Sequence, residues 1–412
     1  MLNRIEARNF KSFKHLDYKC AKLNLLTGLN GAGKSSFVQL MLLLRATANR
    51  VCERSPRIHL PKTGVAKTFG DIKYCYDASN APIVFSVDYS VADSHDRYKV
   101  IREIVPCHNE LGSVQKSKEV SFEPLQFETV EQNKLYGYMD VWRRMTYVEA
   151  FHVKPKDVHD GNHFSCEQWF SDGKTFDPEG RYVIEFLCNY GDRLTLREGN
   201  PMAHLDSEFR PSRSCDCQER ESTLLNQINA WLNELSPGAS LCVNRIELGD
   251  EDNYIFNVGF GNEDDFRKFK PQNVGLGISY VLPVLSILLA SAPNDILVIE
   301  NPEAHIHPKG QSKIGELIAR AVSYGVQVFV ETHSDHVING IRVAVRDGML
   351  KPEDVNIAFF ERKEYLKDDA KDSDDIEIYS EIRNIKIDDN GSLSEYPEDF
   401  MDEWNNQLLE LM

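Results

Sequence analysis

The fold is decided by the stretch Gly28-Leu29-Asn30-Gly31-Ala32-Gly33-Lys34-Ser35. It fully matches the pattern G-x-x-x-x-G-K-[ST], in which glycines let backbone N–H groups turn inward around phosphate oxygens. Residues 2–10 predict a first strand and residues 11–16 a turn after it. Apolar residues 23–26 predict a buried strand, and residues 35–48 have the apolar spacing of a helix with one buried face. This order of elements predicts a nucleotide-binding α/β fold.

The pattern also assigns roles to residues of this phosphate loop. Lys34 is expected to reach the β and γ phosphates, and Ser35 to ligate Mg²⁺. The positive end of the following helix adds to the attraction for an anion. The predicted nucleotide-binding residues of the loop are Asn30, Gly31, Ala32, Gly33, Lys34, Ser35 and Ser36. ATP and Mg²⁺ are therefore the predicted cofactors.

Two short apolar runs, residues 296–299 and 326–330, are typical of buried parallel strands, with a predicted helix at 311–323 between them. The first run leads into Glu300, which we expect to be the second metal ligand. Glu303 follows in the turn and can orient the attacking water. His333 follows the second run and is expected to hydrogen-bond the γ-phosphate.

A second glycine-containing loop, at residues 273–279, precedes an apolar helix. Glycine-rich backbone and a serine hydroxyl at a helix start suit an anion. Because the phosphate loop already covers its own side of the nucleotide, we expect this second loop to complete the site of another subunit across a twofold interface. The residues predicted for this contact are Asn273, Gly275, Gly277 and Ser279.

Composition limits the class of protein. The 412 residues carry a net charge of −17, and residues 351–412 hold 19 acidic and 7 basic residues, so 12 of these negative charges lie in the tail. Such acidity disfavours indiscriminate nucleic-acid binding, although a small basic groove elsewhere would not show in the net charge. The first residues lack the pattern of a signal peptide, no apolar stretch is long enough for a bilayer, and the nine cysteines favour reduced thiols. We expect a soluble cytoplasmic protein with no membrane partner.

The chain is expected to comprise four segments. Residues 1–109 form an N-terminal ATPase lobe with the phosphate loop and antiparallel strands, and residues 110–226 form an insertion. Residues 227–350 form a C-terminal ATPase lobe, and residues 351–412 an acidic α+β extension. The insertion shows no sustained heptads, so a long coiled coil is not expected.

These elements, in this order, resemble the ABC-type head ATPases of the structural-maintenance-of-chromosomes and overcoming-lysogenization-defect kind. Residues 7–13, Ala-Arg-Asn-Phe-Lys-Ser-Phe, look like their first-strand signature, and residues 300–308 look like their extended Walker B box. Similarity in residues 273–283, 331–340 and 391–400 narrows the resemblance to a bacterial group of stand-alone ATPases with an uncharacterised C-terminal domain. The resemblance covers about half the chain and implies a mixed sheet flanked by helices, with an antiparallel β subdomain.

By this resemblance Lys11 joins the nucleotide-binding residues, the 275–279 loop is the signature loop acting in trans, and His333 is the switch histidine. The common box ends Asp-Glu-Pro, whereas this chain has Glu300-Asn301-Pro302. An amide cannot act as a general base, so either Glu303 takes over or hydrolysis is slow and the protein is mainly an ATP-driven dimer switch. The usual glutamine loop has no evident place, since Gln39 lies within the first helix.

Three functions are open at this point. The first is a Mg²⁺-dependent ATPase that works as a homodimer, or a higher oligomer, and controls a separate effector in bacterial anti-phage defence, by analogy with the family. A nuclease or toxin would be that effector. The second is an ATP-dependent nuclease or DNA-repair enzyme, with Asp372 and Asp374 of the acidic run 367–377 in catalysis. The third is a dimeric scaffold that binds ATP with little turnover, for which Asn301 is the best evidence.

Overall fold

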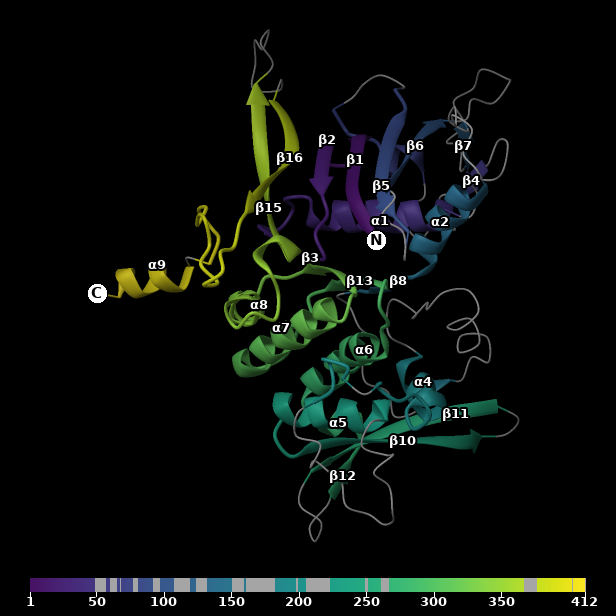
Figure 1. Ribbon diagram of the computed structural model, residues 1–412, viewed down its shortest axis with the longest axis vertical. Helices are drawn as coiled ribbons and strands as arrows, with labels where there is room; N and C mark the ends of the chain where they lie inside the picture. Colours follow the sequence, from purple (N-terminus) through teal and green to yellow (C-terminus); the bar gives the residue numbers. More distant parts are fainter. Residues whose placement is uncertain are drawn as a thin grey trace. The chain divides into compact units, whose positions relative to one another are not determined.

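The computed structural model describes residues 1–48, 57–59, 65–66, 68–76, 81–91, 97–106, 119–123, 132–149, 159–160, 182–197, 199–204, 223–248, 251–260, 267–366, 376–401 and 403–411 (Figure 1). The chain divides into two compact units. Unit 1 comprises residues 1–143, 356–386 and 394–412, and unit 2 comprises residues 144–355 and 387–393. These boundaries differ from the four expected segments, because residues 356–386 of the predicted extension belong to the unit that carries the phosphate loop.

Unit 1 contains an antiparallel sheet with the strand order β2-β1-β5-β6-β7-β4. Its strands are β1 (Leu2–Phe10), β2 (Phe13–Lys19), β4 (Arg57–His59), β5 (Ile83–Ser90), β6 (Arg97–Pro106) and β7 (Glu119–Glu123). The antiparallel strands expected within residues 1–109 are confirmed, and β5 pairs with β6 from residue 83 opposite residue 104 to residue 90 opposite residue 97. The turn predicted at 11–16 is too long, because Phe13 already pairs with Phe10 and alternate burial of Leu16 and Tyr18 continues a strand.

The phosphate loop lies between β3 (Leu23–Gly28) and α1 (Lys34–Ala48), as predicted. Two strands from the C-terminal part, β15 (Val355–Leu366) and β16 (Ile376–Ile385), pair antiparallel and continue the order β16-β15-β3. Phe360 of β15 packs edge-on against Phe37 of α1, with ring centroids 6.1 Å apart. Unit 1 also contains α2 (Gln132–Arg143) and α9 (Glu403–Glu410).

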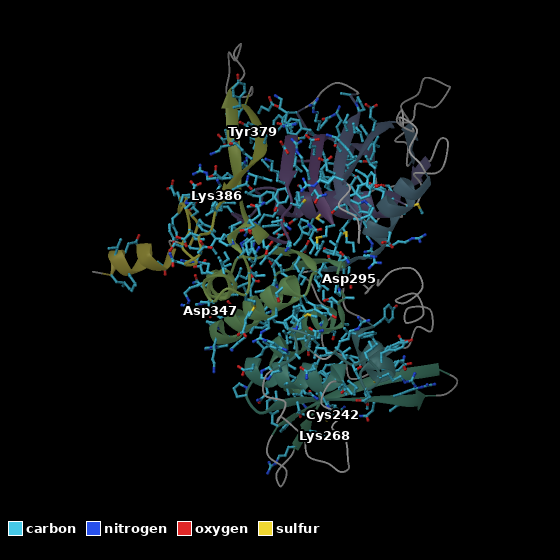
Figure 2. The ribbon with its side chains drawn as sticks, in the orientation of Figure 1. Cys242, Lys268, Asp295, Asp347, Tyr379 and Lys386 are labelled. Carbon is cyan, nitrogen blue, oxygen red and sulfur yellow. The ribbon has the colours of Figure 1, made fainter. Side chains whose placement is uncertain are left out.

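Unit 2 is built on three parallel strands in the order β14-β13-β8. They are β8 (Met145–Val148), β13 (Ile296–Glu300) and β14 (Gln327–Glu331). Their continuous apolar runs are buried, as expected for strands covered on both faces. Glu300 and Glu331 are register partners at the ends of their strands, so both reach the same edge of the sheet. The turn before β13 is closed by Asp295 (Figure 2), which accepts a hydrogen bond from the Ala292 N–H at 2.7 Å.

Helices and a second sheet complete unit 2. These elements are α4 (Val183–Tyr190), α5 (Leu224–Leu235), α6 (Leu276–Ala290), α7 (Pro308–Ser323), α8 (Asp335–Arg346), and strands β9 (His159–Asp160), β10 (Ala239–Leu248), β11 (Glu251–Phe260) and β12 (Arg267–Phe269). Helix α7 begins before the predicted residue 311, because His307 caps it and Pro308 fits its first position. None of the described helices is long and apolar enough to cross a membrane.

Two glycines set the spacing of α7 and α8, the helices that precede and follow β14 in the sequence. A Cβ on Gly340 would collide with the carbonyl oxygen of Ser312, and a Cβ on Gly315 would collide with the carbonyl oxygen of Val337. The two helix backbones therefore approach more closely than any larger residue allows. This approach fixes the start of α8 and, with it, the segment that carries His333.

We expect Gly340→Ala to lower the thermal unfolding midpoint. The added methyl overpacks the helix contact at a cost of about 1–3 kcal/mol, which outweighs alanine's propensity gain of about 1 kcal/mol in a helix. Val343→Ala, at an exposed position of α8, serves as the control and should change stability by less than about 0.5 kcal/mol. An unchanged or higher midpoint for Gly340→Ala would show that the α7 and α8 backbones leave room for a methyl group at this position.

Candidate functional site

The phosphate loop of unit 1 is held from within by its lysine. Lys34 is only 3% exposed, and its Nζ donates hydrogen bonds to the carbonyl oxygens of Gly28 at 2.8 Å and Leu29 at 2.9 Å. The Phe37 N–H bonds to the Gly33 carbonyl at 3.0 Å, so α1 starts directly from the loop. Gly33 has φ +111°, a conformation that side chains other than glycine rarely adopt. The ammonium group and the first amides of the helix thus belong to one compact turn.

Lys11, predicted as a nucleotide-binding residue, lies beside the helix that follows the loop. It has φ +48° directly after β1, and its Nζ donates a hydrogen bond to Oε1 of Gln39 on α1. Burial lowers the pKa of the Lys11 ammonium. Gln39, which has no evident role by sequence, is therefore the acceptor for a half-buried cation within unit 1.

Glu300 stands at the end of β13 in unit 2 and is held by a tyrosine that the sequence analysis did not single out. The Tyr147 hydroxyl, on the neighbouring strand β8, donates a hydrogen bond to Glu300 Oε1 at 3.1 Å. Burial, and then the nearby carboxylates of Glu300 and Glu149, raise the pKa of Tyr147 well above its ordinary value. The hydroxyl therefore keeps its proton and remains a donor to Glu300.

The residue after Glu300 adopts a special backbone conformation. Asn301 has φ +44°, and its N–H bonds to the carbonyl of Glu331 at 2.8 Å. Asparagine tolerates this left-handed region better than most residues. Its Oδ1 is buried and has no hydrogen-bond partner among the residues that the structure describes. Asparagine therefore suits the backbone of this turn, and its Oδ1 is available as a hydrogen-bond acceptor.

Glu303 and His333 come together in the same unit. Glu303 Oε1 accepts a hydrogen bond from the His333 backbone N–H at 2.9 Å, whereas Oε2 is buried without a partner in the described part of the chain. Burial raises the pKa of the Glu303 carboxyl, and the hydrogen bond from His333 only partly opposes this rise. A carboxylate fixed on one oxygen, with a raised pKa, is a stronger proton acceptor on the other oxygen.

The loop predicted to act in trans also lies in unit 2. Asn273 and Gly275 are exposed, and Leu276 exposes 47% of its surface at the start of α6. Gly277 packs against the backbone of His305 so closely that a Cβ would collide with its carbonyl oxygen. The hydroxyl of Ser279 is buried without a hydrogen-bond partner in the described ranges. The outer face of this loop is open to solvent, while its inner face rests on the turn that contains Asn301 and Glu303.

The structure therefore groups the predicted residues in two sets. Unit 1 holds Lys11 and the phosphate loop with Ser35 and Ser36, and unit 2 holds Glu300, Asn301, Glu303, His333 and the 273–279 loop. Among the described residues no group of three or more His, Cys, Asp or Glu is arranged to hold a metal ion. A magnesium nucleotide needs no such cage, because Mg²⁺ is usually bound through one or two carboxylates and substrate phosphates. Positions 367–375, which include Asp372 and Asp374, lie outside the described residues.

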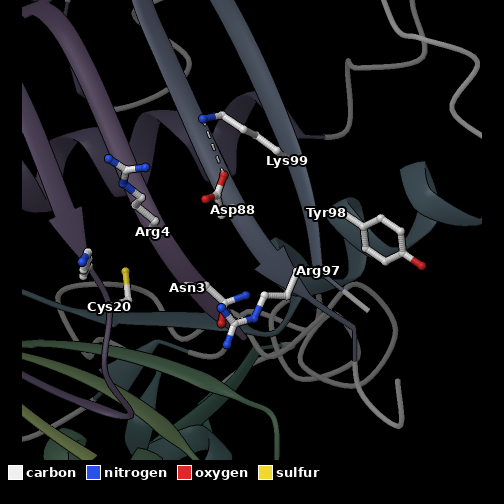
Figure 3. A pocket seen from close by; sticks show the side chains of 8 residues that line it. Asn3, Arg4, Cys20, Asp88, Arg97, Tyr98 and Lys99 are labelled. Carbon is white, nitrogen blue, oxygen red and sulfur yellow. Dashed lines mark ion pairs between the residues drawn. The ribbon is translucent and has the colours of Figure 1, made fainter. Parts of the chain in front are cut away.

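A hollow of about 480 Å³ on unit 1 is a separate feature (Figure 3). Its charged lining residues are Arg4, Lys19, Asp88, Arg97 and Lys99. Arg4 binds Asp17 through two hydrogen bonds of 2.6 Å, and Lys99 pairs with Glu6 at 3.0 Å. Two of its four cations are thus already neutralised, and none of the predicted nucleotide-binding residues lines it.

Comparison with known proteins decides the family. A family profile described as "AAA domain, putative AbiEii toxin, Type IV TA system" matches residues 131–339, just over half of the chain. The chain belongs to this family. The match includes Glu300 and His333, whereas the phosphate loop precedes it. A second profile, "Protein of unknown function (DUF3696)", matches residues 350–411.

A solved structure of an Smc head shows the fold of this AAA-domain protein. An Smc head bound to the C-winged helix domain of ScpA has a TM-score of 0.50 and 10% identity, covering 93% of this chain and 97% of that chain. The Smc head of Pyrococcus furiosus, bound to the C-terminal domain of ScpA, gives a TM-score of 0.49 and 11% identity, covering 100% and 99%. No curated protein matches. The chain has the ABC-type head fold of P-loop ATPases, and its family supports nucleotide binding and hydrolysis in general.

Tyr147→Phe tests the hydroxyl that holds Glu300. The ring stays in place, but the carboxylate loses the donor that orients it, so the Mg²⁺ concentration for half-maximal ATP turnover should rise about tenfold. Tyr138→Phe, at another buried tyrosine, is the matched control and should leave the Mg²⁺ dependence unchanged. A Tyr147→Phe protein with the wild-type Mg²⁺ dependence would exclude this role.

Proposed function

We propose that this protein binds and hydrolyses Mg²⁺-ATP, with the phosphate loop holding the nucleotide, Glu300 as a metal ligand and Glu303 acting on water. The observation that carries the proposal is the complete phosphate loop between a buried strand and a helix, with Lys34 buried within it. Membership in an AAA domain family supports the same activity.

The residues fit the two cofactors. The loop offers inward amides, an ammonium group and the start of α1, all of which suit the negative charge of phosphates. The Ser35 hydroxyl and the Glu300 carboxylate are oxygen donors of the kind that Mg²⁺ prefers. When bound, Mg²⁺ neutralises charge on the β and γ phosphates. Lys34 adds positive charge at the same phosphates, and Tyr147 keeps one oxygen of Glu300 oriented.

Glu303 is the proposed general base. In hydrolysis the water oxygen forms a bond to the γ-phosphorus, the bond from that phosphorus to the ADP oxygen breaks, and a water proton passes to the carboxylate. The unpartnered Oε2 is the atom that accepts this proton, because Oε1 is held by the His333 N–H. This role compensates for Asn301, whose amide occupies the place of the usual catalytic glutamate. The His333 side chain is proposed to contact the γ-phosphate.

We further propose a homodimer in which the 273–279 loop of one subunit closes the nucleotide site of the other. The exposure of Asn273, Gly275 and Leu276 supports this, since these residues are open to a second chain. Smc heads are found bound to ScpA, a separate protein, which supports a regulatory ATPase acting through a partner. A nuclease or toxin effector in anti-phage defence fits this arrangement.

A dimeric scaffold with little turnover is the second candidate. It is favoured by one observation, the amide of Asn301 where the common box has its catalytic carboxylate. The two candidates share the phosphate loop and differ in whether Glu303 removes a proton from water. Turnover measurements therefore separate them.

Purified protein should release phosphate from ATP, and Lys34→Ala should reduce this release about 100-fold or more, because one preorganised cation at the phosphates is lost. Lys22→Ala, at an exposed lysine of the same unit, should retain wild-type turnover. Equal turnover by Lys34→Ala and wild type would exclude the phosphate loop as the site. Metal-dependent DNA cleavage by the protein alone would favour the nuclease function instead.

The pH dependence tests Glu303. A base must be ionised to accept a proton, so turnover should fall as the pH drops through the raised pKa of Glu303, at a midpoint above the ordinary glutamate value of about 4.3. Glu303→Gln should lower kcat by about 10²–10⁴ and remove this acid limb. Glu353→Gln, at an exposed position of unit 2, should change neither quantity. Full activity of Glu303→Gln would assign the base elsewhere.

A further inference from the structure

The C-terminal strands of unit 1 lie directly against the phosphate loop. Gly28, the first loop glycine, has φ +128°, and a Cβ there would collide with the Phe360 carbonyl of β15. The Phe360 ring also packs edge-on with Phe13, at 6.3 Å between centroids. Residues 350–411 belong to a family without an assigned function. Their strands nevertheless form one wall of the predicted nucleotide-binding loop.

Two serine hydroxyls fill the space behind Gly33. A Cβ on Gly33 would collide with Ser380 Oγ, and it would lie 2.8 Å from Ser380 Cβ and 2.9 Å from Ser12 Oγ. The Ser380 N–H donates to the Ser12 carbonyl at 2.8 Å, which joins β16 to the segment after β1. Ser12 Oγ is buried and has no hydrogen-bond partner in the part of unit 1 that the structure describes. Gly33 therefore rests on a surface with no room for further atoms.

A buried carboxylate fixes β16 in this position. Glu377, three residues before Ser380, accepts a hydrogen bond from the Tyr74 hydroxyl at 2.9 Å and pairs with Lys14 at 3.1 Å. The Tyr74 hydroxyl also bonds to the Ile378 carbonyl at 3.1 Å. Burial and the Glu377 carboxylate raise the pKa of Tyr74, so the hydroxyl stays protonated as a donor. These bonds hold the part of β16 that includes Tyr379 (Figure 2) next to β2.

We propose that Ser380 is a positioning residue for ATP binding, and that the C-terminal segment is an integral part of the nucleotide site in unit 1. This rests on the proposed ATP-binding function. Ser380 is 5% exposed, and its Oγ occupies the space that a Cβ on Gly33 would need. Its size sets how far the loop backbone sits from the wall. A larger side chain displaces Gly33 and misaligns the N–H groups that receive the phosphates.

The test is equilibrium binding of a non-hydrolysable ATP analogue to the full chain, with thermal unfolding of the nucleotide-free protein in parallel. Ser380→Val should weaken binding about tenfold or more, in line with the cost of overpacking. Ser380→Thr, which adds one methyl, should have a smaller effect in the same direction, and Ser380→Ala should bind within about threefold of wild type. Asn384→Val, at an exposed position of β16, is the control and should bind as wild type.

A merely structural role would lower the unfolding midpoint without this graded loss of affinity. Ser380→Val and Ser380→Thr proteins that bind the analogue as tightly as wild type would overturn the proposal, as would an equal loss in Asn384→Val. Failure of the proposed function looks different, because the wild-type protein itself would then bind no analogue.

Discussion

The phosphate loop of unit 1 is constrained by its contact with the β15 backbone. Gly28 leaves no room for a side chain against the Phe360 carbonyl, so the end of β3 and a strand from the far end of the sequence must arrive together. The loop leads into α1 at Lys34, whose side chain is buried. Unit 1 therefore combines residues 1–143 with residues 356–386 and 394–412, and the C-terminal strands pack against the loop.

In unit 2, carboxylates lie close to one edge of the parallel sheet. Parallel pairing of β13 and β14 brings Glu300 and Glu331 to the same level. Burying a carboxylate is costly unless hydrogen bonds compensate. Tyr147 provides such a bond to Glu300, and the His333 N–H provides one to Glu303. Burial nevertheless raises the pKa of the Glu303 carboxyl despite its hydrogen bonds. The compensation is thus partial at Glu303, which is what a proton acceptor requires.

Local patterns predicted much of this arrangement. The glycine-lysine-serine spacing located the loop, and the apolar runs at 296–299 and 326–330 located two strands, because both signals are contained in a few consecutive residues. Tyr147 was missed because its strand has only four residues and is surrounded by polar stretches, although the run Met145–Val148 is a weak signal of a buried strand. The place of Ser380 depends on pairing between distant segments, which no local periodicity encodes. Asn301 departs from the glutamate of the common Walker B box, and its left-handed backbone conformation explains why asparagine suits that position.

The central claim is that the Gly28–Ser35 turn binds a nucleoside triphosphate. Isothermal titration of the wild-type chain with a non-hydrolysable ATP analogue and Mg²⁺ tests it most directly. We expect saturation at one nucleotide per chain, with binding weakened when Mg²⁺ is chelated. A protein sample that shows a thermal unfolding transition, and is therefore folded, but gives no binding heat at millimolar analogue would contradict this claim.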